Sequence, residues 1–278
     1  MPSDPTAEGA GYLRRPVTQV RGASVQPADD LLAEEIPVAV HYDGVAFAVM
    51  MATPHDLEDF AYGFSLTEGR AHPRDIVAIG IRPVLEGIFL DITTRHPAPT
   101  GADEGGRNLP GRSGCGICGS RLLEEVVKHP AAVAEGTTIS AAALEAALQA
   151  LEHRQPLNAA TGATHAAAWA RPDGALVLVR EDVGRHNALD KLIGAMLRAG
   201  VEPDRGFALV TSRASYEMVT KAAIAGMPLL AAISAPTALA VHLAQDCGLT
   251  LAGFVRPGRH VIYSHPRRLI QPEDPTAG

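Results

Sequence analysis

The sequence predicts an α/β protein with a C-terminal domain on a largely parallel sheet and a smaller N-terminal α+β part. Three observations lead to this fold class. After about residue 160, strand-like and helix-like segments alternate with short connections, as in parallel sheets with helical crossovers. Before residue 95, paired β-patterned segments surround one helix-like segment. Between these parts, a Gly- and Pro-rich stretch with few apolar residues indicates a mobile connection.

The composition restricts the class of protein. The 278 residues are 46% hydrophobic and 20% charged, as in globular domains, and no apolar run reaches the length of a membrane helix. The net charge of −7 argues against a general nucleic-acid binder, which needs a basic face. Three cysteines and the lack of an export signal at the start favour a reducing cytoplasm.

The N-terminal part is predicted to contain two strand pairs and one helix. Residues 1–15 are expected to be flexible, and residues 16–95 form the small domain. Asp43-Gly44 separates two strand-like runs and predicts a tight hairpin. Thr53 is the expected N-cap of the helix that follows, with Pro54 at its first position and Gly69 at its end. Residues 76–84 and 87–94 are predicted to form a second strand pair.

The mobile Gly/Pro-rich loop is assigned to residues 96–119, and the larger domain to residues 120–278. A helix is predicted from Ser120 to Lys128, and another is expected after Ser140, its N-cap. Further along, the strand–helix alternation predicts strands at 174–182, 206–212, 228–234 and 249–256, with 260–264 as a hairpin partner. The intervening helices are predicted at 187–200, 214–226 and 236–248.

The turns that follow these strands are expected to meet at one edge of the sheet, where ligands bind in open α/β folds. Helix N-termini at this edge favour anions, and arginines and small polar side chains gather in the same turns. The candidates are Arg185, His186, Asn187, Ser212, Arg213, Ser215, Ser234, Thr237, Arg256 and Arg259. They predict a phosphate-bearing ligand. In the alternative interpretation, Asn187 and the hydroxyl side chains only cap helices.

Two histidines are candidates for chemical roles. His186 lies at a predicted helix start between Arg185 and Asn187, where it could bind the ligand or carry a proton near neutral pH. His165 lies before a predicted strand among small residues. On sequence alone, a buried structural histidine is the simpler interpretation for it.

The stretch GRSGCGICGSR contains Cys115 and Cys118, two of the three cysteines. A structural zinc site needs four ligands, and the chain has no second cysteine pair. A nucleic-acid deaminase would need His-x-Glu before Pro-Cys-x-x-Cys, which is absent, so no metal site is predicted. A thioredoxin-type couple stays an alternative. Flanking arginines, a nearby helix start and surrounding glycines favour a mobile, nucleophilic thiolate that carries sulfur.

The order and spacing of several motifs resemble the FdhD family, over about Val17 to Tyr263. The motifs are EEIPVAVHYDG, MMATPHDLEDFAYGFSLTEG, GRSGCGICG, HAAAW, EDVGRHNALDKLIG, SRASYEMVTKAA, SAPTALAV and GFVRPGRHVIY. Gly162-Ala163 stands where the family pattern leads us to expect Gly-Gly, and the Gly/Pro-rich loop looks longer than usual.

The resemblance implies a sulfurtransferase with a three-layer, cytidine-deaminase-like fold that forms homodimers. Such a protein takes sulfur as a persulfide from a cysteine desulfurase. It passes the sulfur to the molybdenum (or tungsten) bis-pterin guanine dinucleotide cofactor, which formate dehydrogenase apoprotein receives. Cys115 matches the persulfide cysteine and Cys118 its partner. The cofactor-binding segment matches Phe254, Val255, Arg256, Pro257, Gly258 and Arg259, and GDP or GMP is expected to mimic the ligand.

Two rivals differ in function class. One is a binding module, a chaperone that protects and delivers the cofactor without sulfur chemistry. The other is a nucleotide-dependent enzyme, such as a relic of a deaminase. Zinc in the purified protein would support this alternative. Replacing Cys115 with Ala separates the first rival from sulfur transfer, because a pure chaperone would still yield active formate dehydrogenase.

Overall fold

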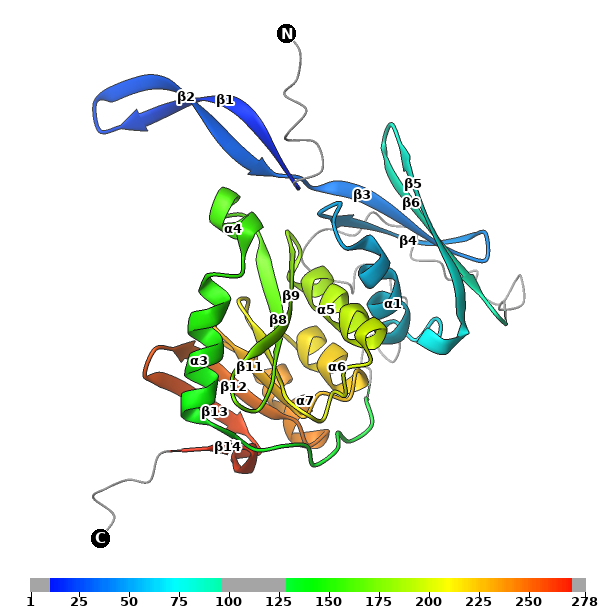
Figure 1. The fold of residues 1–278 in the computed structure, drawn as a ribbon, viewed down its shortest axis with the longest axis vertical. Coiled ribbons are helices and arrows are strands. Elements are labelled where there is room, and N and C mark those ends of the chain that lie inside the picture. Colours follow the sequence, from blue (N-terminus) through cyan, green and yellow to red (C-terminus); the bar gives the residue numbers. More distant parts are fainter. Residues whose placement is uncertain (1–10, 97–128, 272–278) are drawn as a thin grey trace.

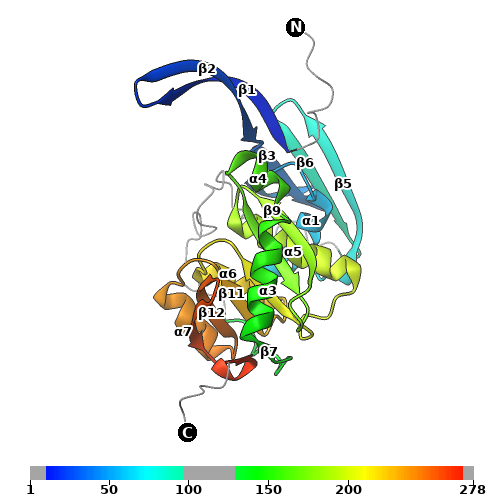
Figure 2. The same ribbon diagram turned by 60° about the vertical axis from the view of Figure 1, so that its left-hand side comes forward.

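The computed structural model describes residues 11–96 and 129–271, with a large sheet domain next to a smaller one (Figure 1). Turning the molecule shows α1 and α5 between the two sheets (Figure 2). Cys115, Cys118 and the predicted helix from Ser120 to Lys128 lie outside the described residues. So does most of the predicted mobile loop, residues 97–119.

The large domain is built on a six-stranded sheet in the order β13-β12-β11-β10-β8-β9. The strands are β8 (His165–Ala170), β9 (Leu176–Asp182), β10 (Phe207–Val210), β11 (Leu229–Ala232), β12 (Thr250–Arg256) and β13 (Arg259–Ser264). Only β10, β11 and β12 pair in parallel, and the other three pairings are antiparallel. The prediction of a largely parallel sheet was therefore wrong in detail, because β8 inserts between β9 and β10.

The strands that precede the helices nevertheless share one direction. β8 is antiparallel to both of its neighbours, so β9 runs the same way as β10, β11 and β12. Their carboxyl ends consequently reach the same edge of the sheet. The predicted gathering of four turns at that edge is confirmed by this topology.

Helices cover both faces of the sheet. One face carries α5 (Arg185–Ala199), α6 (Tyr216–Ile224) and α7 (Ala238–Asp246), and the other carries α3 (Ala141–Glu152). Along β8, Trp169 joins the core cluster under α5 to α7, whereas Ala168 joins the cluster under α3. This alternation is the two-residue period of a strand buried on both faces. Ser140 caps α3 by accepting a hydrogen bond from Ala143 N, as predicted.

The small domain has a four-stranded sheet in the order β4-β3-β6-β5. Its strands are β3 (Ile36–Tyr42), β4 (Val45–Ala52), β5 (Ile76–Val84) and β6 (Gly87–Thr94). Both predicted hairpins are present, and Asp43 and Gly44 in the first turn have positive φ angles. The core of this sheet packs against α1 (Leu57–Thr67) through residues such as Phe60 and Phe64.

The predicted start of α1 is wrong. The helix begins at Leu57, and its N-cap is Asp56 with φ 53°. Thr53 does not cap the helix, because its backbone N–H and its hydroxyl both donate to Asp182 of the large domain. The predicted end is confirmed, since Gly69 follows the C-cap residue with φ 69°.

Helices α1 and α5 touch along their backbones. A Cβ at Gly63 would lie 1.8 Å from the carbonyl oxygen of Asp190, and one at Gly194 would lie 1.8 Å from that of Asp59. The Asp59 side chain, 3% exposed, accepts from Arg180 and Arg198 at 2.7 and 2.6 Å. The two domains are therefore held together by close packing and by charged hydrogen bonds.

The remaining elements are short or peripheral. β1 (Tyr12–Arg21) and β2 (Ser24–Ala33) form an arm that projects from the molecule, so β1 begins inside the segment expected to be flexible. The others are α4 (Pro156–Thr161), β7 (Ile139–Ser140), β14 (Leu269–Ile270), η1 (Pro73–Asp75) and η2 (Pro266–Arg268).

Candidate functional site

The four predicted turns are joined to one another along the sheet edge. We call residues 180–187, 211–215, 234–237 and 254–259 the candidate edge. Ala214 accepts from Thr237 N and donates to the carbonyl of Ala235, at 3.0 and 3.2 Å. Phe254 N donates to the carbonyl of Ser234 at 3.1 Å. Backbone contacts thus tie three of the turns into one continuous surface.

The fourth turn joins this surface through His186. Its Nε2 lies 2.9 Å from a carboxylate oxygen of Glu217 and 3.4 Å from the hydroxyl of Ser215. Burial raises the pKa of Glu217, but the hydrogen bond and charge of His186 together with the charge of Lys221 outweigh burial, and the pKa lies below its ordinary value. The first turns of α5 and α6 are thereby linked by an acid–base pair.

Glu217 was missed by the sequence analysis. It stands two residues after Ser215, in the first turn of α6. An acidic residue there favours the helix dipole, so the pattern alone looks structural. Its proximity to His186 depends on the packing of α5 beside α6.

His165 also reaches the candidate edge. It is the first residue of β8, rather than preceding a strand, and it pairs with Asp182 across the sheet. Burial, Arg185 and His186 lower the pKa of His165, against a smaller opposing effect of Asp182. The interpretation as a wholly buried histidine is not supported, because the residue is only partly buried. These surroundings disfavour protonation, so the His165 imidazole is mostly neutral at neutral pH.

The four arginines occupy different positions. Arg213 and Arg259 are exposed on the edge, and Arg185 is partly buried at the first position of α5. The guanidinium of Arg256 donates to the carbonyls of Ile233 and Val255. Arg256 therefore braces the ends of β11 and β12, while Arg213 and Arg259 present positive charge to the solvent.

Two of the polar side chains cap helices, as the alternative interpretation expected, whereas Asn187 and Ser212 do not. Ser215 and Thr237 are the N-caps of α6 and α7. The Ser212 hydroxyl donates to the carbonyl of Arg213. Asn187 is 3% exposed and donates to Asp182 and to the carbonyl of Met51. These groups shape the edge, and the helix N-termini they organise supply its N–H donors.

Phe254 adopts an unusual backbone conformation. Its φ is 51°, a left-handed value that is rare for a bulky residue, and it lies in an irregular stretch of the β12–β13 pairing. Its side chain is among the exposed large hydrophobic groups, at 38%. Strained residues of this kind concentrate at functional sites, and an exposed aromatic ring can stack on a nucleotide base.

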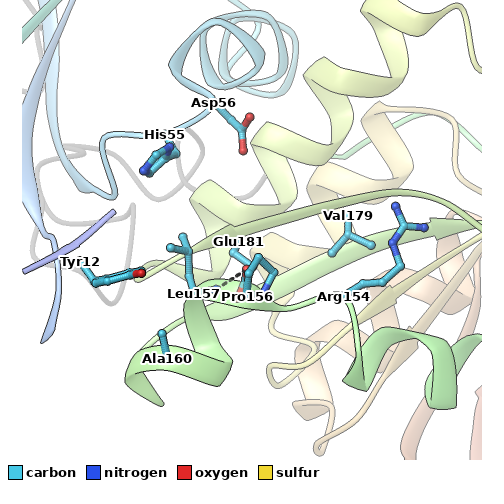
Figure 3. Close-up of a pocket in the computed structure, with 9 residues that line it drawn as sticks. All are labelled: Tyr12, His55, Asp56, Arg154, Pro156, Leu157, Ala160, Val179 and Glu181. Carbon is cyan, nitrogen blue, oxygen red and sulfur yellow. Dashed lines mark hydrogen bonds between the residues drawn. The ribbon is translucent and has the colours of Figure 1, made fainter. Parts of the chain in front are cut away.

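A pocket of about 620 Å³ lies on the other side of β9, near the arm. Figure 3 shows Tyr12, His55 and Asp56 on one side of it and Arg154 and Glu181 on the other. The Glu181 carboxylate accepts from the backbone N–H groups of Leu157 and Asn158, so it anchors α4. None of the predicted site residues lines this pocket, and Glu181 is its only lining residue that falls within the candidate edge.

Other site types find no support among residues 11–96 and 129–271. No group of three or more potential ligands there could hold a metal ion. Within the same ranges, no helix is long and apolar enough to cross a membrane. Cys247 is 2% exposed, and burial raises its pKa, so it is a core residue and a poor nucleophile.

Comparison with known proteins places the chain among its relatives. A model of the FdhD/NarQ family matches residues 33–270. The sulfur carrier protein FdhD of Xanthomonas campestris pv. campestris strain B100 is 54% identical over 269 residues, 96% of this chain and 95% of that protein. The protein of the same name from Cupriavidus necator is 51% identical over 254 residues, 91% of this chain and 88% of that protein.

A solved structure has the same fold. It is described as a candidate formate dehydrogenase accessory protein from Desulfotalea psychrophila, with a TM-score of 0.73 and 24% identity. The similarity covers 93% of this chain and 99% of that one. The arrangement of two sheets with α1 and α5 between them is thus shared across a distant relationship.

Proposed function

The chain belongs to the FdhD/NarQ family, and we propose that it is a cytoplasmic sulfur carrier that supports formate dehydrogenase. The observation that carries the proposal is identity above 50%, over nearly the whole length, to proteins named sulfur carrier protein FdhD. The candidate edge, with its exposed arginines and helix N-termini, supports a nucleotide-bearing cargo.

Cys115 is the proposed carrier of sulfur. Its thiolate attacks the outer sulfur of a persulfide on a cysteine desulfurase, and a new S–S bond forms as the old one breaks. The desulfurase cysteine leaves as a thiolate, and Cys115 then carries the persulfide, so charge and protons balance. For release, the Cys118 thiolate attacks the inner sulfur of the Cys115 persulfide, so that a Cys115–Cys118 disulfide forms as the outer sulfur leaves as hydrosulfide, and a small-molecule thiol then reduces the disulfide. The protein is in this sense a sulfurtransferase.

The proposed cargo is the molybdenum or tungsten bis-pterin guanine dinucleotide cofactor. Its phosphates would meet the N-termini of α5, α6 and α7 and the guanidinium groups of Arg185, Arg213 and Arg259. Phe254 would offer its ring to an aromatic base. The sulfur acceptor is this bound cofactor, which then passes to formate dehydrogenase apoprotein. We also propose that two copies of the chain act as a homodimer.

Mass spectrometry tests the sulfur chemistry directly. After incubation with a cysteine desulfurase and cysteine, we expect a gain of one sulfur atom on the peptide that contains Cys115 and Cys118. Cys115→Ala should abolish both this gain and the activation of formate dehydrogenase in cells. Cys247→Ala is the matched control, because it removes a buried thiol and should leave both unchanged. Full activation by Cys115→Ala would instead establish the chaperone alternative.

Nucleotide binding tests the cargo site separately. Calorimetric titration with GDP should show saturable binding that weakens roughly tenfold in Arg213→Gln or Arg259→Gln, since a charged contact to phosphate is lost. Arg171→Gln is the control, because Arg171 is exposed at the opposite end of β8 and pairs with Asp173. Equal affinity in all of these variants would remove the candidate edge as the cargo site.

A further inference from the structure

Thr53 belongs to the small domain but lies inside a polar cluster of the large one. It precedes α1 and is fully buried. Its backbone N–H and its hydroxyl donate to the same carboxylate oxygen of Asp182, at 3.0 and 2.9 Å. Asp182 is the last residue of β9 and is also fully buried. The linker to α1 is therefore fastened to the strand end from which the candidate edge begins.

The other oxygen of Asp182 holds the site turn itself. It accepts from the backbone N–H of Gly184 at 2.7 Å and from the Asn187 amide at 3.1 Å. The Asn187 amide also donates to the carbonyl of Met51, at 2.8 Å. One oxygen of the Asp182 carboxylate thus binds Thr53 in the linker before α1, and the other binds the turn between β9 and α5. Arg185 and His186 lie between the two residues of the turn that it holds.

Lys191 completes the cluster from the second turn of α5. Its ammonium lies 2.6 Å from the Asp182 carboxylate and donates to the carbonyl and hydroxyl of Thr53, at 3.1 and 2.8 Å. All three donors of the ammonium are used, and the side chain is fully buried. A buried ion pair satisfied in this way contributes little net stability. It does select one arrangement of the groups around it.

We propose that Thr53 is a positioning residue of the candidate edge. Through Asp182, its hydroxyl fixes the turn that presents Arg185 and His186, so the small domain acts on binding without touching the ligand. This inference rests on the proposed function, in which the ligand at the edge bears a nucleotide. It extends that function by giving the small domain a part in holding the cargo.

Three substitutions separate positioning from simple support of the fold. Thr53→Val keeps the shape and removes the hydroxyl, and Thr53→Ser keeps the hydroxyl. Thr67→Val is the matched control at the other end of α1. Its buried hydroxyl donates to Asp190 at 2.7 Å, in a cluster with Lys221 that lies away from the turn. Both Val variants lose a buried hydroxyl at the domain interface, but only one loses a contact with Asp182.

The affinity for GDP is measured at a temperature at which circular dichroism shows every variant folded. We expect Thr53→Val to weaken binding roughly tenfold, while Thr53→Ser and Thr67→Val bind within about twofold of wild type. Thr53→Ala is measured as well, because it leaves room for a water molecule in place of the hydroxyl. If Thr53→Val does not fold, the affinity of Thr53→Ala tests the proposal.

A double-mutant cycle checks the route of the effect. If Thr53 acts through the turn, Arg185→Gln should cost less affinity in the Thr53→Val background than in wild type. Wild-type affinity in folded Thr53→Val and Thr53→Ala, or additive losses in the cycle, would overturn this inference alone. Absence of GDP binding in wild type would overturn the cargo site and this inference together, while sulfur loading of Cys115 would still test the rest.

Discussion

The Nε2 atom of His186 lies 2.9 Å from a carboxylate oxygen of Glu217, and this contact joins the first turns of α5 and α6. Both side chains are largely buried, at 14% and 21% exposed. The pair therefore connects two turns of the candidate edge and also carries charge within it.

The pair should make stability depend on pH in the acid range. The pKa of Glu217 is lower in the folded chain than its ordinary 4.5. The contribution of the Glu217 carboxylate to the unfolding free energy is therefore complete above pH 4.5. This contribution is lost as the pH falls through the pKa of the folded chain. We expect Glu217→Gln to lower the unfolding free energy by about 1 kcal/mol at neutral pH, and by much less near pH 3.

Urea unfolding of both proteins at the two pH values measures this difference. Glu202→Gln is the control, because Glu202 pairs with Arg205 on the exposed surface and such pairs contribute little. A cost of Glu217→Gln that stays constant with pH would show that the ion pair has no such role.

The imidazole of His165 should titrate below its ordinary pKa of 6.5, since burial and then Arg185 and His186 disfavour its charged form. As the pH falls below 6.5, the His165 ring takes up a proton in the unfolded chain at a higher pH than in the folded chain. Protonation of His165 therefore destabilises the fold as the pH falls. NMR titration of the His165 ring should show the low midpoint. Arg185→Gln should move it upward, whereas the remote Arg171→Gln should not. A midpoint at or above 6.5 in wild type would contradict the described surroundings.

The crossing of α1 and α5 should tolerate no added methyl group. Because a Cβ at Gly63 or Gly194 would overlap a backbone carbonyl, we expect Gly63→Ala or Gly194→Ala to reduce the unfolding free energy by at least about 2 kcal/mol. Gly80→Ala is the control, since its Cβ would lie 3.6 Å from the nearest atom. Denaturant midpoints measure all three, and equal midpoints would mean that the helices do not touch in solution.

At position 254, glycine should give a more stable protein than alanine, the reverse of the usual order. At the φ of 51° that Phe254 adopts, glycine is free of the penalty that a Cβ incurs, so Phe254→Gly should be more stable than Phe254→Ala by about 1 kcal/mol. Both variants lose the ring and should bind GDP more weakly, by roughly tenfold. Thermal unfolding and calorimetry separate the two effects. A more stable Ala variant would show that the residue has an ordinary conformation.

Much of the large domain could be predicted from hydrophobic patterning. The helices on its main face and the strands before them follow regular periodicities, and their alternation placed four turns at one edge. β8 was not predicted as a strand, because HAAAWA lacks the branched residues typical of strands. Alanine suits that position because β8 is covered by helices on both faces. The same missed strand accounts for two of the three antiparallel pairings in the sheet.

The side chains of the site were harder to predict than its location. Asn187 faces Met51, 136 positions away, and Thr53 bonds Asp182 across 129 positions. Such long-range contacts decided that Asn187 points inward and that α1 starts late. Local propensities for capping carry no information about them. The cysteine pair was identified from sequence alone, and its assignment stays a prediction.

The glycine crossing has a consequence for protein engineering. Domain shuffling between relatives conventionally cuts a chain between its domains, and here such a cut falls between residues 96 and 129. Gly63 and Gly194 lie on opposite sides of such a cut, and each needs the backbone of the other's helix. A working chimera must therefore inherit α1 and α5 from the same parent.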